Sequence, residues 1–186
     1  MLKIKELIDC IQGCCNNERG SQKKIYISFY GFAMSVCSKY ANNKDDATEI
    51  VNDGFLKIFT NLNQSTKPAH ELSVSFLGLA KRIFVNTAID HYRRNKKHEV
   101  VEELNYCHDE VSFKGNDVIE KLSRDEIMKA VQTLPPGYRI VFNLYVIEGM
   151  THKQISEELF IAEGTSKSNL AKARILLQKK LLIQSL

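Results

Sequence analysis

The chain of 186 residues is 44% hydrophobic and 26% charged, which is typical of a globular protein with one medium core or two small ones. Its net charge of +4 is small, so where the charges lie along the chain is more informative than their sum. No stretch approaches the roughly 18 apolar residues of a membrane span, and the N-terminus alternates charged and apolar residues. We therefore expect no membrane insertion, no signal peptide and a cytoplasmic location.

A helical period dominates the N-terminal half. Residues 23–41 are almost continuously apolar and predict a buried helix that ends at the polar break 42–44. Residues 45–62 repeat apolar side chains at i, i+3 and i+4 spacings, and Asp45 or Asp46 can cap the start of this second helix. Its apolar face consists of Ala47, Ile50, Val51, Phe55, Ile58 and Leu62, and its polar face of Glu49, Asn52, Asp53 and Lys57.

A third helix is expected after a loop that contains Thr66, Lys67 and Pro68. The spacing of Phe76 and Phe84 in this helix favours burial over a role as stacking platforms for bases. The first three helices can therefore close one core. The period of the third helix runs over residues 73–94, through Phe76, Leu77, Ala80, Ile83, Phe84, Ala88 and Ile89.

Charged residues are distributed unevenly. Residues 81–97 hold six Lys or Arg and one acid, residues 99–126 hold nine acids and three bases, and residues 164–180 hold five bases and no acid. Two basic blocks around an acidic one indicate two polyanion-binding surfaces joined by a solvated segment. Either basic block alone is equally consistent with an ordinary exposed helix face. Residues 98–121 contain few side chains able to anchor a core, and we interpret them as an acidic linker.

The C-terminal half has a helical period of its own. It begins near Leu122 and breaks at Pro135 and Pro136, which can start a helix but not sit inside one. A new helix is expected there, with Val141, Leu144 and Tyr145 pointing inward and an end at Gly149. The fold class is therefore all-α, with two small helical domains.

The stretch from Met150 to Ile155 has the form of a capping box with a hydrophobic staple. Thr151 can cap the helix start while Gln154 reaches back, and Met150 can touch Ile155. A helix is expected to begin here, with Ile155 and Leu159 as its buried edge.

A second helix after a tight turn completes a helix-turn-helix pattern. At about 100° per residue, four apolar side chains fall within about 80° of one another and face inward. Around the rest of this helix, Lys167 and Arg174 are suited to phosphates. Four further residues can reach base edges in a major groove. The alternative is a solvated amphipathic helix. The inward residues are Leu170, Ala173, Leu177 and Leu181, and the base-reading group is Ser168, Asn169, Ala171 and Lys172.

The turn of this pattern departs from the usual one at two positions. Such a turn commonly needs a residue with positive φ, and Phe160 adopts that conformation less readily than glycine, at a cost of about 1 kcal/mol. Ala162 stands where Ser or Thr would cap the second helix, so Thr165 or water has to serve instead.

Cysteines and histidines give no sign of a metal or catalytic centre. The histidines have no nucleophile, metal or carboxylate partner at a recognised catalytic spacing, so we expect no enzymatic activity. An odd number of cysteines without a disulfide-like framework indicates reduced thiols. Adjacent cysteines without a second ligand pair make a poor tetrahedral site, so no metal and no cofactor are expected. The cysteines are Cys10, Cys14, Cys15, Cys37 and Cys107.

Three stretches together carry a resemblance to a known family. They are DDATEIVNDGFLKIF, SFLGLAKRIFVNTAIDHYRR and LPPGYRIVFNLYVIEGMTHKQISEELFIAEGTSKSNLAKAR. In this order they resemble region 2.2, regions 2.3 and 2.4, and region 4 of bacterial sigma factors of the sigma-70 superfamily. The resemblance is to the extracytoplasmic-function (ECF) group, which keeps only regions 2 and 4. Three motifs in the right order are more specific than any one of them.

The resemblance implies a non-catalytic factor that docks on core RNA polymerase, recognises a promoter and helps open it. It also implies a region 2 domain over residues 1–97, a region 4 domain over 122–186, and an anti-sigma factor as a further partner. Between them, the acidic linker resembles a segment that threads the polymerase near the RNA path. The loop of residues 61–73 corresponds to the segment that captures an extruded −10 base.

The resemblance also implies roles for individual residues. Those on the polymerase-binding face are Glu49, Asn52, Asp53 and Lys57. Those on the −10 surface are Lys81, Arg82, Asn86, Arg93 and Arg94. In the −35 site, Lys167, Ser168, Ala171 and Lys172 match the positions that read the bases, Asn169 lies among them, and His152, Thr165 and Arg174 contact phosphates.

Two other functions are considered. In a two-domain helix-turn-helix regulator, the C-terminal unit would bind operator DNA while the N-terminal helices sense a ligand or dimerise. The basic residues 81–97 argue against it, because a pure sensor has no use for them. A nucleic-acid-modifying enzyme has no support in the chain.

Overall fold

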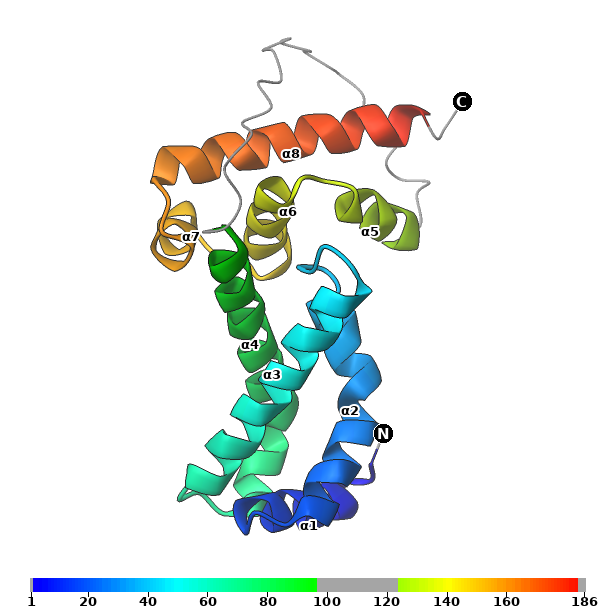
Figure 1. Cartoon of the computed structure of the whole chain (residues 1–186), viewed down its shortest axis with the longest axis vertical. Coiled ribbons are helices and arrows are strands. Elements are labelled where there is room, and N and C mark those ends of the chain that lie inside the picture. Colours follow the sequence, from blue (N-terminus) through cyan, green and yellow to red (C-terminus); the bar gives the residue numbers. More distant parts are fainter. Residues whose placement is uncertain (1, 97–123, 184–186) are drawn as a thin grey trace. The chain divides into compact units, whose positions relative to one another are not determined.

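The computed structural model describes residues 2–96 and 124–183, and the side chains of residues 2–96 and 126–181. Within these ranges every element is a helix, in agreement with the predicted all-α fold (Figure 1). The chain forms two compact units, residues 1–91 and 92–186. The predicted linker, residues 98–121, lies outside the described residues.

The first unit is built on α1 (Ile4–Cys15), α2 (Arg19–Cys37), α3 (Lys44–Gln64) and α4 (Ala69–Lys96), of which α4 continues past residue 91. α1 lies across the ends of the other helices (Figure 1). The sequence analysis expects three helices here, so α1 is one that it missed. The sequence does contain the signal, because Ile4, Leu7, Ile8 and Ile11 recur at helical spacing, and Ile11 is fully buried.

Aromatic side chains join α2, α3 and α4 in the core. The ring of Phe29 lies 5.0 Å from that of Phe76, and the ring of Phe55 lies 5.3 Å from that of Phe84, both edge to face. Such pairs add about 0.5–1.5 kcal/mol to the gain from burial. The prediction that Phe76 and Phe84 belong to the core is confirmed. The predicted apolar face of α3 is also buried throughout, namely Ala47, Ile50, Val51, Phe55, Ile58 and Leu62.

Two predictions of burial were wrong. The apolar run 23–41 is buried on one side only, since Ile27 is 65% exposed, and α2 ends at Cys37 rather than at the polar break. Leu77 of α4 is 40% exposed although it follows the buried Phe76. In both helices the apolar stripe of the sequence is wider than the face that the neighbouring helices cover.

The ends of α3 also differ from the prediction. Its N-cap is Asn43, whose side-chain oxygen accepts a hydrogen bond of 2.8 Å from the backbone N–H of Asp46. Asp45 and Asp46 lie in the first turn, where their negative charge interacts favourably with the positive end of the helix dipole. At the other end, α3 runs to Gln64 and α4 begins at Ala69, so the predicted loop 61–73 is reduced to residues 65–68.

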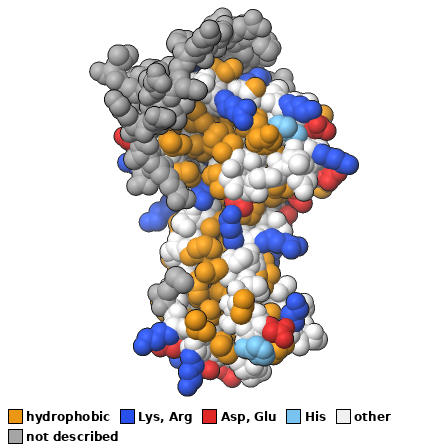
Figure 2. Space-filling model, turned by 180° about the vertical axis from the view of Figure 1, so that it is seen from behind, with side chains coloured by type: hydrophobic (Ala, Val, Ile, Leu, Met, Phe, Trp, Pro, Cys, Tyr) orange, Lys and Arg blue, Asp and Glu red, His pale blue; other side chains and the backbone are white. Residues whose placement is uncertain are grey.

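The apolar residues of α4 form part of this core. By length and composition α4 could cross a membrane, but Phe76, Ala80 and Phe84 are buried among the other helices. Hydrophobic side chains also appear among the polar ones on the surface (Figure 2). The large exposed ones of this unit are Ile4, Ile27, Leu56, Val74 and Leu77.

The cysteines of the first unit pack as apolar side chains. Burial raises the pKa of Cys14 to about 12, helped by the neighbouring Cys10, and burial alone raises the pKa of Cys37 to about 12. Both thiols therefore stay protonated and unreactive at neutral pH. Among the described residues, no three His, Cys, Asp or Glu side chains are grouped so as to hold a metal ion.

The second unit contains α5 (Arg124–Gln132), α6 (Pro136–Phe142), the π-helical segment η2 (Asn143–Ile147), α7 (His152–Leu159) and α8 (Glu163–Ile183). As predicted, Pro136 stands in the first turn of α6, with Pro135 as its N-cap. The helix passes directly into η2, and the chain then turns at Gly149, which has a φ of 71°. Val141 and Leu144 are buried as expected, but Tyr145 is only half-buried.

α8 lies across α5, α6 and α7 and closes the core of this unit (Figure 1). The predicted inward residues Leu170, Ala173 and Leu177 are buried, and the half-buried Leu181 packs beside them. On the opposite side the core consists of Ala130, Val131 and Leu134 of α5 and the turn after it. The long α8 is thereby held rigidly with one face in the core and the other in solvent.

Candidate functional site

α7 and α8 form a helix-turn-helix whose first helix begins as predicted. The side chain of Thr151 accepts a hydrogen bond of 3.2 Å from the backbone N–H of Gln154, and the Gln154 side chain accepts one of 2.8 Å from the backbone N–H of Thr151. Ile155 and Leu159 are buried, also as predicted. A capping box fixes where a helix starts because it satisfies two backbone groups that have no partner inside the helix.

The turn between the two helices is left-handed at Phe160, with φ 51° and ψ 49°. The following residue, Ile161, donates its backbone N–H to the carbonyl of Ser156 at 3.1 Å, which closes the C-terminal end of α7. Thr165 makes no side-chain hydrogen bond within the described chain, so it does not replace the missing cap of α8. The turn therefore has the usual geometry with an unusual residue.

Phe160→Gly is expected to exceed Phe160→Ala in the free energy of unfolding of the second unit by about 1 kcal/mol, because glycine adopts positive φ without the clash of a Cβ. The ring is 79% exposed, but the guanidinium carbon of Arg93 lies 4.4 Å from its centre. Both variants lose this contact, so the difference between them isolates the backbone effect. Urea denaturation of the two variants measures it. Equal stability of Phe160→Gly and Phe160→Ala would contradict a left-handed residue at this position.

The outer face of α8 carries the residues predicted to read DNA. Most of them are exposed, but Asn169 and Lys172 are half-buried. The Nζ atom of Lys172 lies 5.8 Å from the ring centre of Tyr138 in α6, so this side chain leans on its neighbour instead of pointing straight outward. The exposed members of the predicted set are Thr165, Lys167, Ser168, Ala171 and Arg174.

The cations at the two ends of this face have partners in the same unit. Lys167 forms an exposed ion pair of 2.7 Å with Glu163, one turn earlier. The hydrogen bond and charge of Lys167 lower the pKa of the Glu163 carboxyl, which is therefore ionised at neutral pH. The guanidinium carbon of Arg174 lies 6.0 Å from the ring centre of Tyr145. Exposed pairs of this kind contribute little to stability, so these side chains remain able to turn toward a phosphate.

His152 is held by two neighbours that the sequence analysis missed. Its ring stacks on Tyr145 with centres 4.6 Å apart, and its Nδ1 atom lies 2.9 Å from the hydroxyl oxygen of Ser166. Ser166 is fully buried. The sequence could have indicated that Ser166 is buried, because it precedes the inward-facing Leu170 by one helical turn. His152 is thus fixed to the body of the unit, which leaves Nε2 for a further contact.

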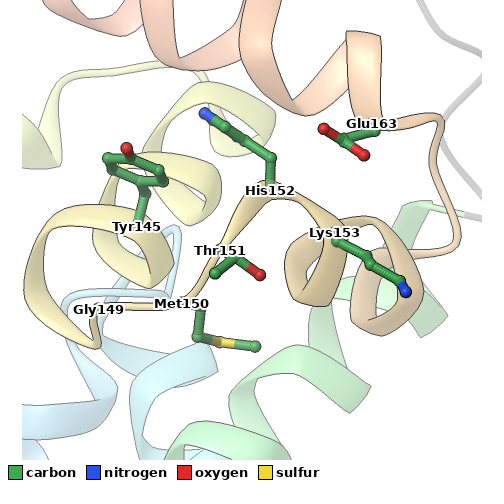
Figure 3. Close-up of a pocket in the computed structure, with 7 residues that line it drawn as sticks. All are labelled: Tyr145, Gly149, Met150, Thr151, His152, Lys153 and Glu163. Atoms are coloured by element: carbon green, nitrogen blue, oxygen red, sulfur yellow. The ribbon is translucent and has the colours of Figure 1, made fainter.

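A shallow hollow of about 470 Å³ lies at the start of α7. Figure 3 shows the rings of Tyr145 and His152 close together at one side, with Lys153 projecting away from them. The hollow mixes a cation, an imidazole and the ionised Glu163, so it has no single charge preference. Its lining consists of Tyr145, Gly149, Met150, Thr151, His152, Lys153 and Glu163.

On α4, the residues predicted for the −10 surface form a row. At about 100° per residue, Arg82, Asn86 and Arg93 lie within about 40° of one another, with Lys81 and Arg94 on the two flanks. Arg82 and Asn86 are exposed on the part of α4 that belongs to the first unit. The guanidinium of Arg93 is instead engaged within the second unit, where it pairs with the Glu158 carboxylate at 3.0 Å and lies 4.4 Å from the centre of the Phe160 ring. The exposed residues of this row suit a nucleic-acid backbone.

On α3, three of the four residues predicted for polymerase binding contact neighbouring helices. Lys57 pairs with Asp90 of α4 at 2.9 Å, and both side chains are about half exposed. The Glu49 carboxylate lies 3.6 Å from Nε2 of His91, also on α4. The third contact is a hydrogen bond between Asn52 and Tyr26 of α2. None of these partners is signalled in the sequence, because each is separated from α3 by a loop or more.

Comparison with known families identifies both parts of the chain. Residues 25–98 match the family model for sigma-70 region 2, and residues 124–177 match the one for sigma-70, region 4. The chain belongs to the sigma-70 family. In this sigma factor, region 2 comprises most of α2 together with α3 and α4, and region 4 comprises α5 to α8. α1 precedes both matched segments.

Named relatives place the protein in the ECF group. It is 26% identical over 153 residues to RNA polymerase sigma factor SigV of Bacillus subtilis (strain 168), covering 82% of this chain and 84% of that protein. ECF RNA polymerase sigma factor SigE of Mycolicibacterium smegmatis is 26% identical over 141 residues, 73% of this chain and 52% of that protein. RNA polymerase sigma factor SigZ of Bacillus subtilis is 29% identical over 93 residues, covering 50% and 51%. The chain spans about half the length of the last two.

Proposed function

We propose that this ECF sigma factor directs core RNA polymerase to promoters through three separate faces: α3 for the polymerase, α4 for the −10 element and α8 for the −35 element. The observation that carries the proposal is the presence of regions 2 and 4 in order on one chain. An operator-binding regulator needs region 4 alone and is not favoured. The domains of this sigma factor are those proposed from the sequence: residues 1–97 and 122–186, with the acidic linker at 98–121 between them.

Region 4 binds double-stranded −35 DNA through the outer face of α8. Ser168, Ala171 and Lys172 face the base edges together with Asn169, and the small Ala171 suits a thymine methyl group. Lys167, Thr165 and Arg174 hold phosphates on either side, and His152 adds a contact through Nε2 at the start of α7. The rigid packing of α8 supports this role, because a reading helix has to present its side chains at a fixed register.

Region 2 binds the −10 element as a single strand. A base can be held only after it has left the duplex stack, and cations along α4 then retain the backbone. Lys81, Arg82, Asn86, Arg93 and Arg94 supply this surface. We assign the capture of the extruded base to the short loop of residues 65–68 and the helix ends beside it.

Polymerase binds the polar face of α3, where Glu49, Asn52, Asp53 and Lys57 are exposed or half-buried. Lys57 and Glu49 contact Asp90 and His91 of α4, and because both contacts are partly exposed, these side chains remain able to turn toward the partner. We further propose that the protein has no catalytic activity of its own, acts in the cytoplasm and is controlled by an anti-sigma factor that covers one of these faces.

Reconstitution with bacterial core polymerase tests the proposal. Transcription is scored from a duplex promoter and from a pre-melted bubble, with and without the protein. Promoter-dependent transcripts that require the protein are the expected result. If the chain binds DNA equally well alone and never stimulates core polymerase, the sigma function is wrong.

Two substitutions test the division of roles. Lys172→Ala should weaken −35 duplex binding by about fivefold or more, roughly 1 kcal/mol, and leave polymerase affinity unchanged. Asp53→Ala should weaken core polymerase binding by about tenfold and leave −35 binding unchanged. Lys179→Ala is the matched control, since it removes an exposed cation farther along α8. If both mutants lose the same interaction, the assignment of separate faces fails.

A further inference from the structure

The outer seam between α2 and α3 contains a contact that no family motif explains. The hydroxyl of Tyr26, on α2, donates a hydrogen bond of 3.0 Å to the side-chain oxygen Oδ1 of Asn52, on α3. The two residues are separated by two helix ends and a loop along the chain. The contact therefore exists only because the two helices pack together.

Tyr26 is a rigid anchor for this bond. Its ring lies 4.7 Å from that of the buried Phe55 and 5.5 Å from that of Tyr30. Partial burial, with a smaller effect of Tyr30, raises the pKa of Tyr26 above its ordinary value, so the hydroxyl keeps its proton at neutral pH. An aromatic side chain packed against two other rings has few alternative positions for its hydroxyl.

Asn52 gains a defined orientation from this anchor. The residue is exposed, and an exposed amide would otherwise sample several rotamers. With Oδ1 facing Tyr26, the amide nitrogen points away from the seam, and it donates to no other group in the part of the chain that the structure describes. A donor that is already oriented loses less conformational entropy when it binds a partner.

We infer that Tyr26 is a positioning residue for polymerase binding, which orients the amide of Asn52 so that its N–H₂ group meets a carbonyl or carboxylate oxygen of the polymerase. The inference rests on the proposed function, in which Asn52 belongs to the polymerase-binding face. Tyr26 acts through Asn52 and needs no contact with the polymerase. Leu56, one turn after Asn52 and 65% exposed, supplies apolar surface beside the amide.

Tyr30 offers a matched control. It lies on the same helix one turn later, its ring contacts that of Tyr26 at a tilt of 45°, and its hydroxyl makes no hydrogen bond with the described residues. Tyr30→Phe and Tyr26→Phe therefore remove the same atom from neighbouring positions. Only Tyr26→Phe releases Asn52.

The experiment compares full-length variants for affinity to core polymerase, with Asn52→Ala as a second background. Tyr26→Phe is expected to raise the dissociation constant by about threefold to tenfold, the size of one hydrogen-bond effect. Tyr30→Phe should leave it within about twofold. In the Asn52→Ala background Tyr26→Phe should have no further effect, because its action passes through the missing amide. Thermal stability and −35 duplex binding should not change.

The outcomes separate this inference from the proposed function. A wild-type protein that does not bind core polymerase overturns the proposed function and this role with it. A wild type that binds, with Tyr26→Phe equal to Tyr30→Phe, overturns the role of Tyr26 alone. An additive loss in the Asn52→Ala background also overturns it, since Tyr26 would then act without Asn52.

Discussion

Gly54→Ala is expected to lower the free energy of unfolding of region 2 by about 1–3 kcal/mol. Gly54 lies on the buried side of α3, and a Cβ placed there would be 2.4 Å and 2.6 Å from two ring carbons of Phe84. Phe84 is fully buried and packed against Phe55, so its ring has no space to move into. Alanine favours a helix over glycine by about 0.5–1 kcal/mol, and the clash is expected to outweigh this gain.

The prediction has a control on α4. Gly78 is also inside a helix, but a Cβ there would meet no atom within 4 Å. Gly78→Ala should therefore stabilise region 2 through the higher helix propensity of alanine alone. Urea denaturation of the two variants gives the comparison, and adding Phe84→Leu should recover part of the loss at Gly54. If Gly54→Ala is as stable as Gly78→Ala, α3 and α4 do not approach as closely as described.

Arg139→Met is expected to destabilise region 4 by about 1–3 kcal/mol. Arg139 is only 4% exposed, and one of its guanidinium nitrogens donates to the carbonyls of Gln132 and Leu134, at 3.1 Å and 3.2 Å. These carbonyls stand where α5 ends, and the end of a helix leaves such groups without a partner of their own. Methionine keeps most of the apolar stem but donates nothing, so the carbonyls lose their buried donor.

Hydrogen exchange followed by mass spectrometry localises this effect. Peptides from α8 should exchange faster in Arg139→Met, and peptides from α3 should not change, because the two helices belong to different units. −35 binding should fall with the population of folded region 4. Lys129→Met is the control, since Lys129 is exposed on α5. Equal protection of α8 in both variants would show that Arg139 is not needed at the end of α5.

Much of the fold was predictable because its signals are local. The burial of the α3 face follows from apolar residues at helical spacing, and the start of α7 follows from Thr151 and Gln154, which are one turn apart. The left-handed turn at Phe160 follows from its place between two amphipathic helices. Errors appeared where a helix face is covered by only part of the fold, as at Ile27 and Leu77, because periodicity describes one helix and not its neighbours.

The sequence by itself determined the all-α class, the order of regions 2 and 4, and which faces of α3, α4 and α8 are polar. All of these depend on residues within a few turns of one another. Because the helical repeat is regular, the spacing of two residues decides whether they lie on the same side of the helix. Only the tertiary structure decided the contacts between helices: Tyr26 with Asn52, Asp90 with Lys57, Ser166 with His152, and Phe84 against Gly54. The members of each pair lie on different helices, so the packing of the helices brings them together and no spacing along the chain encodes it.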